Sequence, residues 1–139
     1  MAIVQTLCTS FKTGLFRAEH NFDTDTFYIA LYTSAASLGE TTTVYTASSE
    51  VVGTGYTAGG IAITGVSVAV SGTTPYITFN NATWVTSTIL ARGALIYNIS
   101  KTNKAVAVLS FGADKQSSGT SFVVQMPANT VSTALIRML

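Results

Sequence analysis

The sequence predicts an all-β fold, an antiparallel β-sandwich of jelly-roll-like type with a short N-terminal α-helix. Runs of β-branched and aromatic residues with period-2 alternation recur at even spacing from residue 27 onward, bounded by Gly, Pro, Asn or Ser. No second helical pattern separates these runs, so crossover connections between parallel strands are not expected. With 139 residues, the chain is expected to form one domain over residues 1–139.

Residues 1–20 predict the helix, because their apolar side chains recur with helical spacing. The apolar positions from Ile3 to Ala18 fall within an arc of about 140° at 100° per residue, and Phe16 points off this face. Gly14 and several threonines lower the helix propensity, so docking on an apolar surface must stabilise the segment. We expect it either to cap one end of the sandwich or to act as an arm that reaches a partner.

Period-2 alternation from Phe27 to Tyr32 predicts the first strand. Further β-rich runs predict strands at residues 61–70, 76–79, 94–98, 105–111, 121–126 and 133–138. Clusters of turn-forming residues at 71–75, 100–103 and 113–119 are expected to join consecutive strands. The last four strands are therefore predicted to form an antiparallel meander.

Residues 34–60 form a long loop region in this interpretation. The segment is rich in Thr, Ser, Ala and Gly and lacks strand periodicity. Loops of this length are uncommon in compact domains unless they have a function, and binding is the usual one.

The chain is unusually poor in charge. Charged residues make up 9% of the sequence, and the formal net charge is +1. This balance argues against nucleic acid as a partner, and no apolar run is long enough to cross a membrane. A folded monomer of this mass exposes about 6,900 Å² of surface, which corresponds to one charged residue for roughly every 500 Å². We expect partner chains to cover part of such a surface, and a homo-oligomer is one way to do so.

Three features that suggest chemistry have simpler explanations. The glycines of residues 53–60 do not match a phosphate-binding loop, and a strand rather than a helix is expected after them. His20, Asp23 and Asp25 lack the further ligands of a zinc or calcium site and fit local hydrogen bonding better. The lone Cys8 is expected to be a small buried hydrophobic residue. We therefore assign no metal and no cofactor.

Catalysis is not expected either. His20 is the only histidine, and no nucleophile-elbow motif is present. The six carboxylates lie in predicted termini or loops rather than at rigid strand positions. We therefore predict that the protein is not an enzyme and has no catalytic residues.

Several segments resemble small structural proteins of tailed bacteriophages. They include residues 27–36 (FYIALYTSAA), 50–60 (EVVGTGYTAGG), 92–98 (RGALIYN) and 105–114 (AVAVLSFGAD). The resemblance implies a non-enzymatic virion protein, with a capsid cement or decoration protein favoured. Its partner would be the major capsid protein, and its location the virion, assembled in the host cytoplasm. On this hypothesis the contacts with the partner are Phe11, Phe16, Tyr45, Val51, Val52 and Tyr56.

Two alternatives stay open. A tail, adaptor, fibre or baseplate protein fits the same resemblance. A carbohydrate-binding module would use Tyr45, Tyr56 and Trp84 to stack on sugar rings, although a single tryptophan is more often a core residue.

Overall fold

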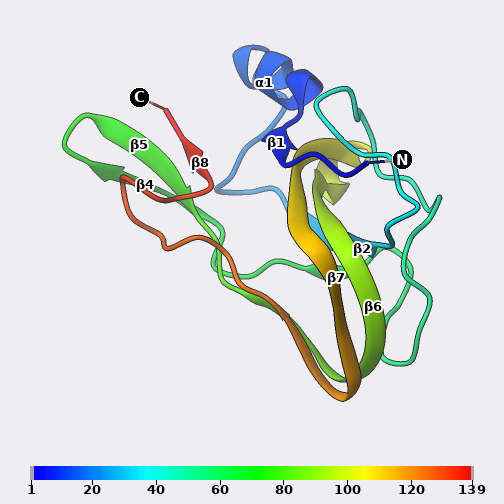
Figure 1. Ribbon diagram of the computed structural model, residues 1–139. Coiled ribbons are helices and arrows are strands. Elements are labelled where there is room, and N and C mark those ends of the chain that lie inside the picture. Colours follow the sequence, from blue (N-terminus) through cyan, green and yellow to red (C-terminus); the bar gives the residue numbers. More distant parts are fainter. Residues whose placement is uncertain (1, 139) are drawn as a thin grey trace.

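The computed structural model describes residues 2–138, so residues 1 and 139 of the predicted domain lie outside the description. It has two antiparallel sheets and one short helix (Figure 1). The strand orders are β1-β7-β6-β2-β3 in the larger sheet and β4-β5-β8 in the smaller one. The elements in chain order are β1 Thr6–Leu7, α1 Thr9–Phe16, β2 Phe27–Tyr32, β3 Ile61–Ala62, β4 Ser67–Ser71, β5 Thr74–Thr78, β6 Ala82–Asn98, η1 Ile99–Lys101, β7 Lys104–Val124 and β8 Ile136–Arg137. The predicted all-β, sandwich-like fold with a short N-terminal helix is confirmed, whereas a jelly-roll topology is not.

The long hairpin of β6 and β7 is the centre of the larger sheet. The two strands are paired from Asn98↔Lys104 at the turn to Ala82↔Val124 at the far end. The turn predicted at 100–103 is confirmed as the short helix η1 and the residues after it. Asn98 stabilises this turn, because its Oδ1 accepts a hydrogen bond from the Ser100 amide at 3.0 Å.

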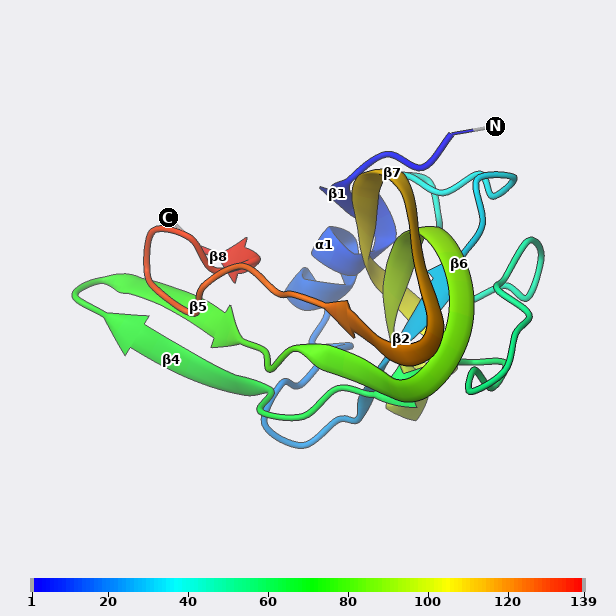
Figure 2. The same cartoon turned by 60° about the horizontal axis from the view of Figure 1, so that its bottom comes forward.

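The hairpin predicted at residues 113–119 is wrong, because this segment lies inside β7. The pairing jumps from Ala91↔Lys115 to Gly93↔Ser110, so residues 111–114 bulge out of the ladder. Bulges and turns favour the same residue types, and the Gly, Asp and Ser of this segment mark a bend in the strand. Figure 2 shows β6 and β7 curving together through this bend. The predicted meander is therefore replaced by one long, bent hairpin.

β2 matches its predicted bounds and is the most deeply buried strand. It pairs with β6 on one side and with β3 on the other. Five of its six residues are buried, and only Tyr28 is partly exposed. A strand covered on both faces is expected to be apolar at successive positions, which explains its sequence FYIALY.

The predicted N-terminal helix is shorter than its apolar pattern suggests. Ile3 instead forms a parallel bridge with Leu38, and β1 pairs with Val108 and Ala107 of β7. Pairing with the edge of the sheet satisfies backbone groups that a helix in this region would use internally. Helix α1 covers only Thr9–Phe16 of the predicted segment 1–20.

The smaller sheet contains the confirmed hairpin at residues 71–75. Gly72 is the first turn residue and has a φ of 62°, whereas Thr73 has no positive φ, as a type II′ turn requires. The predicted strand 61–70 is divided into β3 and β4, and Gly65, with a φ of 67°, lies between them. The predicted strand 133–138 is reduced to β8. This sheet projects from the rest of the molecule (Figure 2).

One cluster of buried side chains joins the two sheets, since it includes Ile77 and Ile136 of the smaller sheet, most of β2, and the buried apolar residues of β6 and β7. Trp84 and Cys8 are buried in it, as expected, and burial raises the pKa of the Cys8 thiol to about 11. Residues 34–60 form the expected long connection, which contains isolated β-bridges but no helix or strand. Within residues 2–138, no helix has the length and apolar character needed to cross a membrane.

Candidate interaction surfaces

A buried glutamate holds the long loop region in place. Glu50 is only 8% exposed, and its carboxylate accepts three hydrogen bonds from residues of the loop. The Tyr45 hydroxyl donates to Oε1 at 2.6 Å, and the Gly59 amide donates to Oε2 at 2.7 Å. The Tyr56 hydroxyl donates to the same Oε2. The carboxylate therefore draws together residues separated by up to 14 positions, from 45 to 59.

The same tyrosines connect the loop to the larger sheet. The Tyr56 hydroxyl accepts a hydrogen bond from the Leu31 amide of β2 at 2.9 Å. The Tyr97 hydroxyl of β6 donates to the Gly59 carbonyl at 2.6 Å, and the ring of Tyr45 stacks on that of Tyr97 at 4.9 Å. The loop is thus fixed to both strands and is not a free arm.

Electrostatics keeps the hydroxyls of this cluster protonated. Burial, and then the hydrogen bond to Glu50, raise the pKa values of Tyr45 and Tyr56 well above the usual 10. Burial and the charge of Glu50 raise the pKa of Tyr97 to about 12. A neutral phenol is a hydrogen-bond donor, so the tyrosines remain matched to the carboxylate at neutral pH. We interpret the cluster as a structural support for the loop.

Four of the six predicted contact residues are buried or half-buried, contrary to the expectation that they lie at the surface. Phe11 is 0% exposed and packs edge-on against the rings of His20 and Phe22, so its assignment as a contact is wrong. Val51 is also buried, and its amide donates to the Leu31 carbonyl at 2.9 Å. Tyr45 and Tyr56 are half-buried, and their hydroxyls bind Glu50, so their exposed contact area is small.

The other two predicted residues lie fully at the surface. Phe16 is 93% exposed at the end of α1, and Val52 is 97% exposed in the loop region. Apolar side chains this exposed gain nothing from the fold itself, because they bury no area. These two positions remain candidates for contact with a partner.

The titratable residues near the end of α1 form a structural cluster. The Asn98 side-chain amide donates to Asp25 Oδ2 at 2.8 Å and contacts His20 Nδ1 at 3.0 Å. Since this amide group only donates, Nδ1 accepts and the ring proton lies on Nε2. Burial, and then the charge of Lys104, lower the pKa of His20 below 6.5. Within residues 2–138, no group of three or more His, Cys, Asp or Glu side chains is arranged to bind a metal ion, and Asp23 lies exposed.

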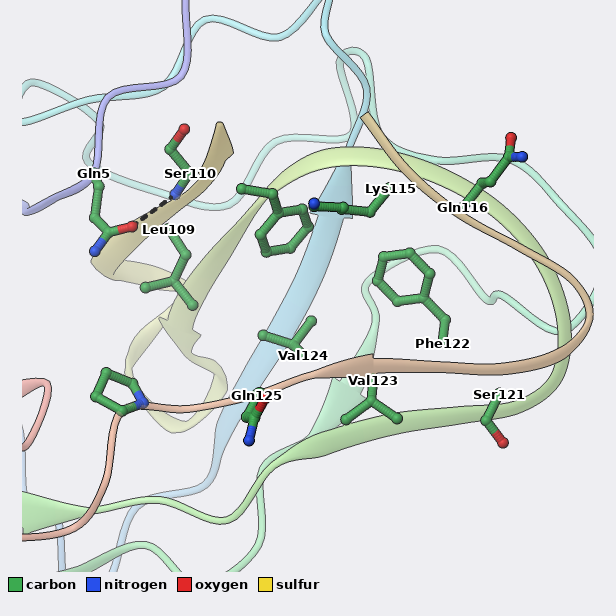
Figure 3. Close-up of a pocket in the computed structure, with 12 residues that line it drawn as sticks. Gln5, Leu109, Ser110, Lys115, Gln116, Ser121, Phe122, Val123, Val124 and Gln125 are labelled. Carbon is green, nitrogen blue, oxygen red and sulfur yellow. Dashed lines mark hydrogen bonds between the residues drawn. The ribbon is translucent and has the colours of Figure 1, made fainter. Parts of the chain in front are cut away.

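A groove follows the concave side of the bent strand β7 (Figure 3). It has a volume of about 410 Å³, and Leu109, Phe122 and Val124 point into it from the two halves of the strand. Gln5 crosses one end, where its Oε1 accepts a hydrogen bond from the Ser110 amide at 3.1 Å. The groove is mainly apolar, and Lys115 is the charged residue in its lining.

A wider cleft of about 750 Å³ lies between α1 and residues 40–44. Its lining includes Arg17, Glu19, Glu40 and Lys104 together with several threonines. Glu19 and Lys104 form an ion pair at 2.9 Å, and this bond lowers the pKa of Glu19. Two of the four charges therefore satisfy each other, and the other two, Arg17 and Glu40, are opposite in sign.

The smaller sheet presents an apolar face that contains none of the six predicted contact residues. Facing residues of antiparallel strands lie on the same side of a sheet, so Val68, Val70, Pro75 and Ile77 share one face. Ile77 is buried against the body, whereas Val68 and Val70 are exposed farther out. The alternation of Val66, Val68 and Val70 was the available signal, but it does not indicate whether a strand projects from the body.

The aromatic residues considered for sugar binding do not form an accessible platform. Trp84 is buried between Tyr56 and Phe122, with ring centroids at 6.0 and 6.2 Å. A stacking site needs an exposed ring face, so the structure does not favour this alternative.

Comparison with known proteins gives no match to a family model, to a curated protein or to a solved structure. The resemblance to phage virion proteins therefore stays a prediction from the sequence.

Proposed function

We propose that this chain is a non-enzymatic structural subunit of a tailed-phage virion, and that it attaches as a cement protein to the shell of the major capsid protein. The observation that supports this proposal most is the number of large apolar side chains at the surface of a molecule in which only 9% of the residues are charged. Phe16, Val52, Val70 and Val85 are all more than 60% exposed, and they lie on four different segments. The surface of a soluble domain usually has about 25–35% charged residues and few exposed large apolar side chains, so this composition favours a surface that a partner covers in part.

The use of the acidic residues also fits a non-enzymatic role. Glu50 is bound by tyrosines, and Glu19 is paired with Lys104. Asp25 is held by Asn98 and Lys101, and Asp114 by Arg92. Each of these carboxylates has a structural partner, which favours a role in stabilising the fold over a role in acid-base chemistry.

Particles assembled with and without the chain test the proposal. Cement proteins hold neighbouring shell subunits together, so particles that lack the chain are expected to rupture at a lower temperature. Adding the purified chain back is expected to restore the rupture temperature and to saturate at hundreds of copies per particle. Saturation at a dozen copies or fewer would place the chain in the tail instead, and no binding to any part of the particle would reject the virion role.

The exposed residues offer a finer test. Phe16→Asp and Val52→Asp are each expected to leave the fold intact, because these side chains bury almost no area. Loss of particle binding in one variant and not in the other would identify the attached face. If both variants bind as the unmodified chain does, neither residue is a contact.

A further inference from the structure

Strand β4 has an open edge. It is the outermost strand of the smaller sheet, and among residues 2–138 only β5 pairs with it. Pro75 of β5, which faces Val70, directs its carbonyl away from β4 and accepts a hydrogen bond from the Met138 amide at 3.0 Å. Peptide groups alternate in direction along a strand, so Val70 and Val68 direct their N–H and C=O groups outward. These backbone groups are free to pair with another strand.

The open edge lacks the features that usually prevent strand pairing. Natural proteins place lysine, proline or a bulge on an exposed edge strand. Strand β4 contains none of these, since its sequence is Ser-Val-Ala-Val-Ser and its pairing with β5 is regular. The whole segment from Val51 to Ala91 contains no charged residue. No electrostatic repulsion therefore opposes the approach of a second uncharged strand.

The sequence of β4 reads the same in both directions. If two copies pair antiparallel about a two-fold axis at Ala69, each Val68 faces Val70 of the second copy, and each Ser67 faces Ser71. This register matches the backbone, because the outward groups of Val68 and Val70 then face each other as hydrogen-bonded pairs. The axis is perpendicular to the sheet, so the valines of both copies lie on the same apolar face.

We propose that β4 of one copy pairs with β4 of a second copy in this register and joins the two smaller sheets into one continuous sheet. A second copy is the occupant that the palindrome supports, because a two-fold interface requires each patch to be complementary to itself. The inference goes beyond attachment to a shell and depends on β4 alone. An edge of five residues buries less area than the roughly 800 Å² per partner of a standard interface, so the dimer is weak in solution. The association becomes stronger where many copies are held close together.

Charge substitutions test the register. In the proposed dimer, Val68→Lys with Val70→Lys places lysines opposite lysines, whereas Val68→Lys with Val70→Glu places each lysine opposite a glutamate. Both side chains point to solvent in the single chain, and both double variants are expected to fold. Analytical ultracentrifugation at low salt should show dimers of the Lys/Glu variant that are at least about tenfold tighter than those of the Lys/Lys variant. Equal association of the two would overturn the proposed register.

A symmetric disulfide gives a second test. Ala69 faces its own copy at a non-hydrogen-bonded position, where the Cα atoms are about 4.5 Å apart, within the range of a disulfide. Ala69→Cys is therefore expected to form a covalent dimer under mild oxidation, while the buried Cys8 stays unreactive. Val85→Cys, at an exposed site on β6, is the matched control. Cross-linking of both variants at equal rates would count against pairing at Ala69.

Two further outcomes separate this inference from the proposed function. A chain that stays monomeric at about 1 mM and still binds phage particles overturns the β4 dimer only. A chain that dimerises through Ala69 but binds no particle rejects the virion role only.

Discussion

Replacing Glu50 with alanine is expected to lower the free energy of unfolding by about 3 kcal/mol. The carboxylate accepts hydrogen bonds from Tyr45, Tyr56 and the Gly59 amide. Hydrogen bonds to a charged group contribute about 1.5–3 kcal/mol each, and the lower value applies because Tyr45 and Tyr56 are only half-buried. Removing the buried charge recovers about 1–2 kcal/mol of desolvation, which leaves the stated loss.

Urea unfolding followed by the fluorescence of Trp84 measures this loss. Trp84 is the only tryptophan, and its ring lies 6.0 Å from that of Tyr56. For a chain of this length, the loss corresponds to a decrease in Tm of about 10 °C. The loop region should also become susceptible to chymotrypsin at Tyr45 and Tyr56 before global unfolding.

Glu40→Ala is the matched control, because Glu40 is an exposed glutamate of the same loop region. Its effect is expected to stay within about 0.5 kcal/mol. If Glu50→Ala and Glu40→Ala changed the stability equally, the hydrogen bonds to Glu50 would not be what holds the loop on β2 and β6.

Three further predictions follow from burial and backbone geometry. Gly60→Ala is expected to lower the free energy of unfolding by more than about 3 kcal/mol, because φ at Gly60 is 80° and a Cβ there would lie 1.8 Å from a β2 carbonyl oxygen. Gly72→Ala has open space around its Cβ and should lower the free energy of unfolding by about 1 kcal/mol. Equal decreases in Tm for the two variants would contradict this reasoning. Phe11→Ala should cost about 3–5 kcal/mol and Phe16→Ala less than about 0.5 kcal/mol in urea unfolding, and a reversed order would refute their assignment to core and surface. Burial lowers the pKa of His20 below 6.5, so the unfolded chain takes up the proton at a higher pH than the folded chain does. The free energy of unfolding should therefore fall as the pH drops below 6.5, by at most about 1.4 kcal/mol per pH unit. An equally large loss in the His20→Gln variant would exclude His20 as the cause.

The sequence predicted those elements whose signals are local. The period-2 pattern from Phe27 to Tyr32 predicted both ends of β2 correctly. All six residues of this run are apolar or aromatic, as expected for a strand that is covered on both faces. Gly72 fixed the β4–β5 turn, because a type II′ turn needs a positive φ at its first central residue. The turn-forming residues 100–103 likewise marked the turn between β6 and β7. Each signal acts over a few residues and does not depend on the rest of the fold.

Errors arose where two structures share one local signal. Residues 113–119 have the composition of a turn, yet β6 continues opposite them, and the same residue types are found at bulges. Ile3 has the spacing of a helical residue, yet it pairs with Leu38. In both cases a distant strand decides between the alternatives, and a single sequence does not show which strand lies nearby.

The predicted contact residues illustrate the same limit. Val51 and Val52 are identical in type and adjacent in sequence, yet Val51 is buried and Val52 is exposed, because alternate side chains of an extended segment point in opposite directions. On α1, the helical wheel did separate Phe16 from the face that contains Phe11. The role of Glu50 gave no sequence signal, because its three partners are brought together only by the folded loop.

The two edges of the smaller sheet differ in a way that limits the size of the proposed assembly. The β8 edge is two residues long and contains Arg137, so it is short and charged. The β4 edge is five residues long and uncharged. Only the β4 edge is therefore open to pairing, and a two-fold contact between two such edges uses both of them. Sedimentation of the purified chain should accordingly show monomers and dimers without larger species, and a continuous ladder of oligomers would mean that a second surface, such as the exposed Phe16 or Val52, also joins copies of the chain.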